Sequence, residues 1–398
     1  MISEQTKPIE MQTHPMRTLG VSGCSNCIVL QPCGGHHLPI IRSLGCVNYT
    51  NNTAPVNTDD MNPLFQEKFW KLWDDVDGLQ DYTIGRLLSI NSASLPPYLP
   101  QLQHRHLKCS RLLDVPIIAL KLFDVLGKRP DGGYAPKYST ASALRAAYKL
   151  RPDSHILLVG VDDDAPIENF WAEHRISGVC EALAKLDLLG VTVPNFSHFT
   201  CVPRFQILRN RKRILLSAER LSNAGVKVSP HLHGITNKDW DFWFGFLKEH
   251  SEVTVVTMEF QTGARADSEV GRKDFEQLLE CQNRLGRPLH PLLVGAARFY
   301  KEAKQGFRSF TIIDSQPFMQ AINRQILTTD SSGRFFWKVS PKSKDAPLEE
   351  LIETNILYYL DKLNGVSSEE LGYQTQNPNQ AELDWLTSTP YLTAQPVA

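Results

Sequence analysis

Residues 253–314 read VTVVTMEFQTGARADSEVGRKDFEQLLECQNRLGRPLHPLLVGAARFYKEAKQGFRSFTIID, a segment in which short apolar runs alternate with longer amphipathic stretches. The apolar runs, 253–258, 289–295 and 309–313, have the length of buried strands, whereas 272–285 and 299–306 have a helical period. Strand, helix, strand at this spacing is typical of parallel βα units. Right-handed crossovers turn a long series of such units into either an open doubly wound sheet or a closed barrel.

The same alternation extends upstream and defines a core at about residues 151–340. Further apolar runs occupy 155–161, 190–193 and 226–229, and the stretches between them again have a helical period. Residues 61–150 are expected to be mainly helical, because aromatic residues recur at helical spacing over 64–79 and a second helical pattern covers 139–150. The remaining segments are a loop-rich, cysteine-rich region at 1–60 and a C-terminal helix with a frayed tail at 341–398.

The composition is that of an ordinary globular protein. The chain has 398 residues, of which 42% are hydrophobic and 21% charged, and its net charge is −1. Such a balance gives no overall attraction to nucleic acid, so any such binding requires a local basic patch. The N-terminus lacks a signal-peptide core and no stretch is apolar enough to span a bilayer, so we expect no membrane association and a cytoplasmic location.

Polar residues follow the predicted strands, where α/β enzymes place their active sites. Asp162, Asp163 and Asp164 end one run, and they can bind a heterocyclic base or a metal, or cap the next helix. His231 and His233 share one side of an extended segment, which suits a ligand or a metal, although satisfied core histidines fit equally. Other polar residues in such positions are Glu259, Gln261, Thr262, Asp314, Ser315 and Gln316.

Two charged or cysteine-rich segments suggest partners. The segment 204–220 contains six basic residues, which can hold nucleic-acid phosphates or form a solvated helix face. The pattern Cys24-x2-Cys27-x5-Cys33-Gly-Gly, followed by Cys46, can place thiolates around one metal centre. It resembles the auxiliary iron–sulfur motifs of SPASM-type domains, which implies a 4Fe-4S cluster. A structural zinc ion and a set of free thiols are the alternatives.

The C-terminal half resembles the tRNA-guanine transglycosylases. The similarity covers roughly residues 155–333 and is densest over 287–333, RPLHPLLVGAARFYKEAKQGFRSFTIIDSQPFMQAINRQILTTDSSG. In that family a strand ends in a glycine motif, here at Gly295, and a later strand ends in an aspartate, here Asp314, with a nearby arginine at Arg324. The runs 258–263, 230–234 and 162–164 stand where the family has its pocket strand, a Gln-Gly-Gly turn and its base-recognising aspartate.

This resemblance implies a (β/α)8 TIM-like barrel that exchanges a guanine in DNA or tRNA for a 7-deazaguanine base. Asp314 would attack the anomeric carbon as the nucleophile, and Asp162 or a neighbouring aspartate would bind the base. Glu259 and Gln261 would line the pocket. The family's downstream zinc cysteines are absent, since no cysteine follows Cys281, and its early Asp-Ser-Gly-Gly-Phe turn has only a loose counterpart at 131–134.

Three further interpretations remain open. The stretch 195–243 is also similar to an uncharacterised bacterial and phage family, which implies a barrel with a different activity. A non-catalytic nucleic-acid-binding or anti-phage defence accessory protein could keep the barrel as a scaffold. An iron–sulfur enzyme acting on a small metabolite would instead depend on the N-terminal cysteines.

Overall fold

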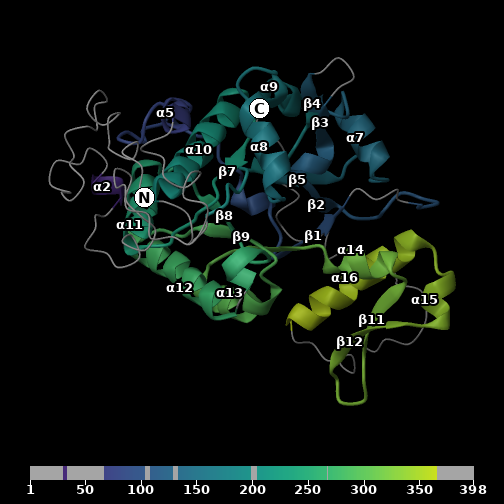
Figure 1. Ribbon diagram of the computed structural model, residues 1–398. Coiled ribbons are helices and arrows are strands. Elements are labelled where there is room, and N and C mark those ends of the chain that lie inside the picture. Colours follow the sequence, from purple (N-terminus) through teal and green to yellow (C-terminus); the bar gives the residue numbers. More distant parts are fainter. Residues whose placement is uncertain are drawn as a thin grey trace, which may run out of the picture.

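The computed structural model describes residues 30–33, 67–103, 108–128, 133–198, 204–266 and 268–364. Its centre is a nearly closed barrel of eight parallel strands with helices between them, a (β/α)8 TIM-like fold (Figure 1). The strands follow one another around the barrel in chain order. They are β1 (Tyr98–Leu102), β2 (Ile117–Lys121), β5 (His155–Val159), β6 (Gly190–Thr192), β7 (Val228–Ser229), β8 (Val255–Glu259), β9 (His290–Val294) and β10 (Thr311–Asp314).

The barrel closes at two seams. Strand β1 pairs in parallel with β10, with Tyr98 opposite Ile312. The seam between β7 and β8 is shorter. There the Thr257 amide donates to the Pro230 carbonyl at 2.8 Å, the Leu232 amide donates to the Thr257 carbonyl at 2.9 Å, and the Ser229 and Thr257 hydroxyls lie 2.7 Å apart. These bonds supply the ladder that a two-residue strand cannot provide alone.

Helices cover the outside of the barrel (Figure 1). Helices α8 (Asp164–Glu173) and α9 (Val179–Leu183) connect β5 to β6, and the longest helix, α10 (Arg204–Asn223), follows β6. Helices α11 (Asn237–Glu249), α12 (Ser268–Leu285) and α13 (Tyr300–Gly306) follow β7, β8 and β9. Within the described ranges, no helix has the length and apolarity needed to cross a bilayer.

Two apolar layers result from strand alternation. Leu157, Val159, Val255 and Ile313 belong to the cluster that fills the barrel, whereas their neighbours in sequence, such as Ile312, pack outward against helices. Burial of apolar surface on both faces explains why these strands are nearly continuous apolar runs.

The region 61–150, which the sequence predicted to be helical, contributes the first two barrel strands. The predicted helices are present as α5 (Glu67–Asp74) and α7 (Ala141–Ala147), but β1 and β2 lie between them and pair with β10 and β5. The predicted start of the core near residue 151 is therefore wrong for these strands. A small hairpin of β3 (Leu126–Lys128) and β4 (Tyr134–Pro136) precedes α7.

The basic segment at the start of α10 is buried, which contradicts both its nucleic-acid and its solvated-face interpretations. Arg204 and Arg211 have no exposed side-chain surface, and both pair with the equally buried Asp239 of α11. Arg204 also donates to the carbonyls of Pro32 and Cys33, so it fastens α2 (Leu30–Cys33) to the barrel. The arginines at the start of α10 therefore join elements, whereas Arg220 near its end is exposed.

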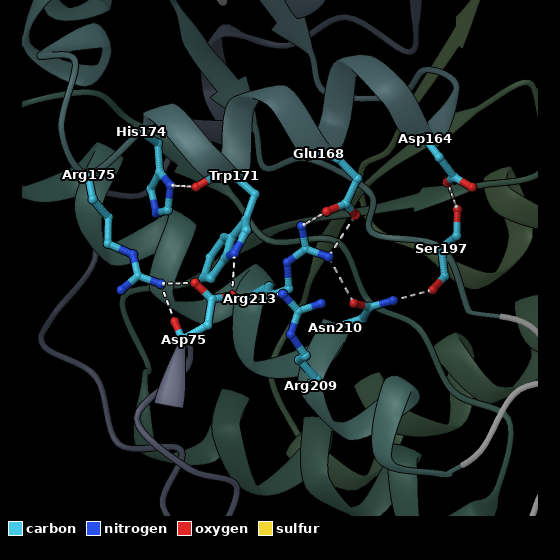
Figure 2. Close-up of polar contacts among 10 residues, drawn as sticks. All are labelled: Asp75, Asp164, Glu168, Trp171, His174, Arg175, Ser197, Arg209, Asn210 and Arg213. Carbon is cyan, nitrogen blue, oxygen red and sulfur yellow. Dashed lines mark hydrogen bonds and ion pairs between the residues drawn. The ribbon is translucent and has the colours of Figure 1, made fainter. Parts of the chain in front are cut away.

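A second set of these basic residues links α8, α10 and the end of α5 (Figure 2). Arg213 makes a two-point contact with Glu168 at 2.6 and 2.8 Å, and Arg209 pairs with Asp75 at 2.7 Å. Asn210 donates to the Ser197 carbonyl at 2.6 Å. Since Ser197 lies in the loop after β6, this network fixes the path of that loop.

The chain after β10 forms a separate layer at one side of the barrel (Figure 1). Helix α14 (Gln316–Ile322) leads into an antiparallel hairpin of β11 (Gln325–Thr329) and β12 (Phe335–Val339), then α15 (Pro341–Asp345) and α16 (Leu348–Asn364). Asn355 of α16 accepts from the Leu327 amide and donates to the Gln325 carbonyl, so α16 carries the hairpin.

Candidate functional site

The carboxyl ends of the barrel strands form a mouth lined by polar side chains. Alternation with the interior residues Leu99, Ala119 and Val255 directs Gln101, Lys121 and Glu259 toward the barrel axis. His231, just after β7, is fully buried and contacts the neighbouring strand end. Inward residues at this end of a barrel are where catalytic groups are found in this fold.

A cluster of three histidines and one arginine lies at the ends of β6, β7 and β8. The rings of His198 and His233 are stacked, with centroids 3.8 Å apart. His231 lies two residues from His233, and the charge of Arg265 acts on all three rings. Arg265 is itself buried, and its Nε donates to Asp274 of α12, which orients the guanidinium.

The histidines are neutral at physiological pH. Burial is the main cause that lowers the pKa of His231 to about 4 and that of His198 to about 3, and the positive charge of Arg265 contributes to both shifts. Burial also holds the pKa of His233 well below its usual value. His231 Nδ1 lies 2.8 Å from the Val193 carbonyl and His198 Nδ1 lies 2.8 Å from the Phe196 carbonyl. Since a carbonyl only accepts, each Nδ1 carries the proton and each Nε2 presents a lone pair.

Several buried polar atoms of this cluster, and one of Asn195 in the loop after β6, have no hydrogen-bond partner among the described residues. They are Asn195 Oδ1, His198 Nε2, His231 Nε2, His233 Nδ1 and both terminal nitrogens of Arg265. Leaving a buried polar atom unpaired costs roughly 1–3 kcal/mol, so unpaired atoms on neighbouring strand ends are candidates for contact with a ligand. The group combines a two-pronged cationic donor with at least three acceptors.

Two carboxylates belong to the same mouth. Glu259 is buried and accepts from the amides of Gln261 and Thr262, both at 2.5 Å, yet burial dominates and raises the pKa of its carboxyl. Asp162 is partly exposed and forms an ion pair with Lys121 at 3.5 Å. A carboxyl whose pKa is raised by burial suits a proton donor, and an ion-paired carboxylate suits a nucleophile.

The other two aspartates of the predicted base-binding group have roles in helix α8. Asp163 occupies the N-cap position, and Asp164 lies in the first turn, where its carboxylate accepts from the Ser197 hydroxyl at 2.5 Å. Carboxylates are favoured at helix N-termini, but the Asp163 side chain makes no capping hydrogen bond there. Only Asp162 of the three contacts another mouth residue, Lys121.

Asp314, the expected nucleophile, faces helix α16. Its Oδ2 accepts from the Tyr359 hydroxyl at 2.8 Å and its Oδ1 accepts from the Gln316 amide at 2.7 Å. Because the preceding residue, Ile313, points into the barrel, alternation turns Asp314 outward. Burial raises the pKa of the Asp314 carboxyl, although both hydrogen bonds oppose this shift. These contacts give Asp314 a place in the strand–helix layer.

Arg324, the other residue expected from the resemblance, begins the β11–β12 hairpin. It adopts a left-handed backbone with φ of +58° and donates to the Ala346 carbonyl at 2.8 Å. Its carbonyl accepts from the Ser343 hydroxyl. Arg324 therefore ties the hairpin to α15, and its guanidinium is engaged there.

Gly295 and Gln261 meet at the mouth between β8 and β9. Gly295 has φ of +68°, and a Cβ at this position would lie 2.5 Å from the Gln261 Cβ. The glycine therefore allows the loop after β8, which carries Gln261 and Arg265, to pack against the end of β9. Both the backbone conformation and the close approach require glycine.

We expect Gly295→Ala to lower the free energy of unfolding by about 2–5 kcal/mol, since left-handed strain costs about 1–2 kcal/mol and overpacking about 1–3 kcal/mol. Gly225→Ala is the matched control, because Gly225 has φ of +91° but no described atom within 4 Å of the added methyl group. Urea titration of both variants should show the larger loss for Gly295→Ala. Equal losses would contradict the packing role.

The predicted metal site falls largely outside the described residues. Cys24, Cys27 and Cys46 lie there, as do Asp131 and Gly132 of the loose family turn. Cys33 is described and is buried at the end of α2, where Arg204 holds its carbonyl. Across the described ranges, no group of three or more histidine, cysteine or acidic side chains is arranged to hold a metal ion.

Sequence reasoning did not identify Lys121, Asn195, His198 or Arg265. Lys121 ends an apolar run, Pro116–Leu120, that has the same signal as the other strands. Asn195 and His198 follow the predicted strand at 190–193, so the rule that polar residues after a strand are site candidates could have identified them. Arg265 lies six positions beyond the end of β8, and nothing in its local sequence distinguishes it.

No protein-family model matches the sequence, and no curated protein matches it significantly.

Proposed function

We propose that the barrel is an enzyme that cleaves or exchanges the glycosidic bond of a guanine-like base, with the reaction taking place at the mouth around β5–β8. The unpartnered buried atoms around Arg265 and the three histidines carry this proposal. Their complement of donors and acceptors matches the edge of a 6-oxopurine. A guanidinium fork pairs with O6 and N7 of guanine, and acceptors pair with N1–H and the 2-amino group.

The acceptor side of this match depends on the neutral histidines. His198 and His231 present lone pairs at Nε2, and Asn195 presents its amide oxygen. An adenine would place an amine against the Arg265 donors and an unprotonated N1 against these acceptors. The pocket chemistry therefore favours guanine over adenine at both edges.

The two mouth carboxylates supply the bond-breaking chemistry of the proposal. An oxygen of Asp162 attacks the anomeric carbon and forms a glycosyl ester, while the bond from that carbon to N9 breaks and its electron pair goes to the base. Glu259 donates a proton to the departing base. In the second half, the nitrogen of an incoming base, or a water molecule, attacks the same carbon, releases Asp162 and returns a proton to Glu259.

Lys121 has a positioning role in this scheme. Its ammonium lies 3.5 Å from Asp162 and holds the carboxylate at the end of β5. The loop after β6 is positioned in the same way by Asn210, which donates to the Ser197 carbonyl (Figure 2). Asn195 and His198 lie on either side of this contact in sequence. The binding atoms are therefore held by the packed helices α8 and α10.

We expect guanine to bind the wild-type protein and to bind Arg265→Lys at least about tenfold more weakly, because lysine keeps the charge but loses the two-pronged donor. Isothermal titration with guanine, hypoxanthine and adenine measures this. Hypoxanthine should bind more weakly than guanine, and adenine weakest of the three.

Arg272→Lys is the control for this titration, since Arg272 is an exposed residue of α12 that pairs with Glu302 at 3.4 Å. It should bind guanine like the wild type. If the wild-type protein binds guanine and adenine equally, or if Arg265→Lys binds guanine normally while remaining folded, the assignment of the base pocket fails.

A further inference from the structure

The β11–β12 hairpin has one anchored face and one free face. Leu327 is fully buried, and the Trp337 ring stacks on Tyr359 of α16 with centroids 6.3 Å apart. On the opposite face of β12, Phe336 is 39% exposed and Lys338 is exposed beside it, with Nζ 5.6 Å from the ring centroid. A rigid support and an exposed aromatic ring next to a cation are the parts of a stacking platform.

The segment that forms the turn, β12 and α15 has an excess of positive charge. Residues 330–345 contain four basic and only two acidic side chains, although the whole chain has a net charge of −1. Arg334 is exposed beside the turn, and Lys342 and Lys344 are exposed on α15. The Asp330 carboxylate accepts from the amides of Ser332 and Arg334, so it is engaged in the turn.

The hairpin lies at the same end of the barrel as the candidate site. Tyr359, on which Trp337 stacks, donates its hydroxyl to Asp314, the last residue of β10. The carboxyl end of β10 belongs to the mouth. The hairpin extends away from this point (Figure 1), so its base lies near the carboxyl end of β10 and its tip lies away from the barrel.

We propose that the outer face of the hairpin binds single-stranded nucleic acid, with Phe336 stacking on a base and Arg334, Lys338 and the α15 lysines contacting phosphates. Stacking on an exposed ring requires an unpaired base, and clustered cations beside it complement the phosphate backbone. Nucleic-acid binding by the hairpin would give the proposed base-exchange site a polymeric substrate. Only this link to base exchange rests on the proposed function; the binding itself does not.

Fluorescence anisotropy with labelled oligothymidylate and oligouridylate tests the binding directly on the full-length protein. We expect Phe336→Ala to weaken binding about tenfold. Arg334→Ala and Lys338→Ala should each reduce the slope of log affinity against log salt concentration by about 0.7. Ile176→Ala and Lys248→Ala, which alter exposed residues outside the hairpin, are the matched controls and should bind like the wild type.

Guanine titration of the same variants distinguishes a failure of the hairpin proposal from a failure of the proposed guanine-binding site. Hairpin variants should retain guanine binding, whereas Arg265→Lys should retain oligothymidylate binding. The hairpin proposal is overturned if the wild-type protein does not bind the oligonucleotides or if the hairpin variants bind them like the controls. Binding to phosphatidylserine vesicles with no binding to oligonucleotides would also overturn it and would identify an anionic membrane surface as the ligand.

Discussion

Asp239→Asn is expected to lower the free energy of unfolding by about 3–5 kcal/mol, because it removes the carboxylate shared by two buried arginines. Asp239 accepts from Arg204 at 2.6 and 3.1 Å and pairs with Arg211, and all three side chains have no exposed surface. Asparagine keeps the size of the side chain and can still cap α11. The decrease in the free energy of unfolding therefore measures the cost of burying two guanidinium charges without their carboxylate.

Asp241→Asn is the matched control, two residues along the same helix. Asp241 pairs with Arg284 at 3.0 Å, but the two side chains are 48% and 37% exposed, so its removal should cost no more than about 1 kcal/mol. Urea unfolding of both variants at pH 7 measures the difference. Similar losses for the two would show that Asp239 does not balance the buried arginines.

Asp239→Asn should also weaken the attachment of α2 to the barrel. Arg204 donates to the carbonyls of Pro32 and Cys33, and its orientation depends on Asp239. Limited proteolysis should therefore cleave near residues 30–33 faster in Asp239→Asn than in Asp241→Asn. This links the charge cluster to the docking of α2.

Strand periodicity was sufficient to predict the core from residue 155 onward. Each predicted run from 155–161 to 309–313 overlaps one barrel strand, because strands buried on both faces are apolar at nearly every position. The run Pro116–Leu120 carries the same signal, but its surroundings suggested helices, and β2 was missed. The choice of a barrel over an open sheet depends on contacts such as Thr257 with Pro230, which no local pattern encodes.

The main obstacle to predicting the site was deciding which residues of each strand face the barrel interior. An all-apolar run does not indicate which residues face inward, so the sequence could not place Ile313 inside the barrel and Asp314 outside it. Burial of arginine was equally unpredictable. Arg204, Arg211 and Arg213 on one helix suggest a surface that faces solvent or binds phosphate, since arginine is rarely buried without a partner. Their acidic partners lie on α8 and α11, which are distant in sequence, so the sequence does not reveal these pairs.

The largest expected effect on activity comes from the mouth carboxylates. If Asp162 is the nucleophile, Asp162→Asn should lower the rate of guanine exchange by at least about a thousandfold, because an amide oxygen cannot form the glycosyl ester. The assay follows incorporation of labelled guanine into single-stranded DNA or tRNA. A covalent protein–nucleic acid adduct should accumulate with the wild type and be absent from Asp162→Asn.

Glu259 gives the pH dependence of the same reaction. As the proton donor it must be protonated, and burial raises its pKa, so the rate should fall as pH increases through that raised value. Glu259→Gln cannot donate this proton. Its rate should be lower by about 10²–10⁴ and should lose the decline on the alkaline side. An unchanged alkaline limb in Glu259→Gln would assign the proton transfer to another group.

Asp314→Asn decides between the two candidate nucleophiles. In the structure the Asp314 carboxylate is occupied by Tyr359 and by the amide of Gln316 in the strand–helix layer. Asparagine keeps one acceptor, so we expect a loss of about 1 kcal/mol in stability and exchange activity within a few-fold of the wild type. Loss of the covalent adduct in Asp314→Asn, with the adduct kept in Asp162→Asn, would instead require β10 to turn Asp314 into the mouth. Strand alternation around Ile313 opposes that rotation, because Ile313 would then leave the barrel interior.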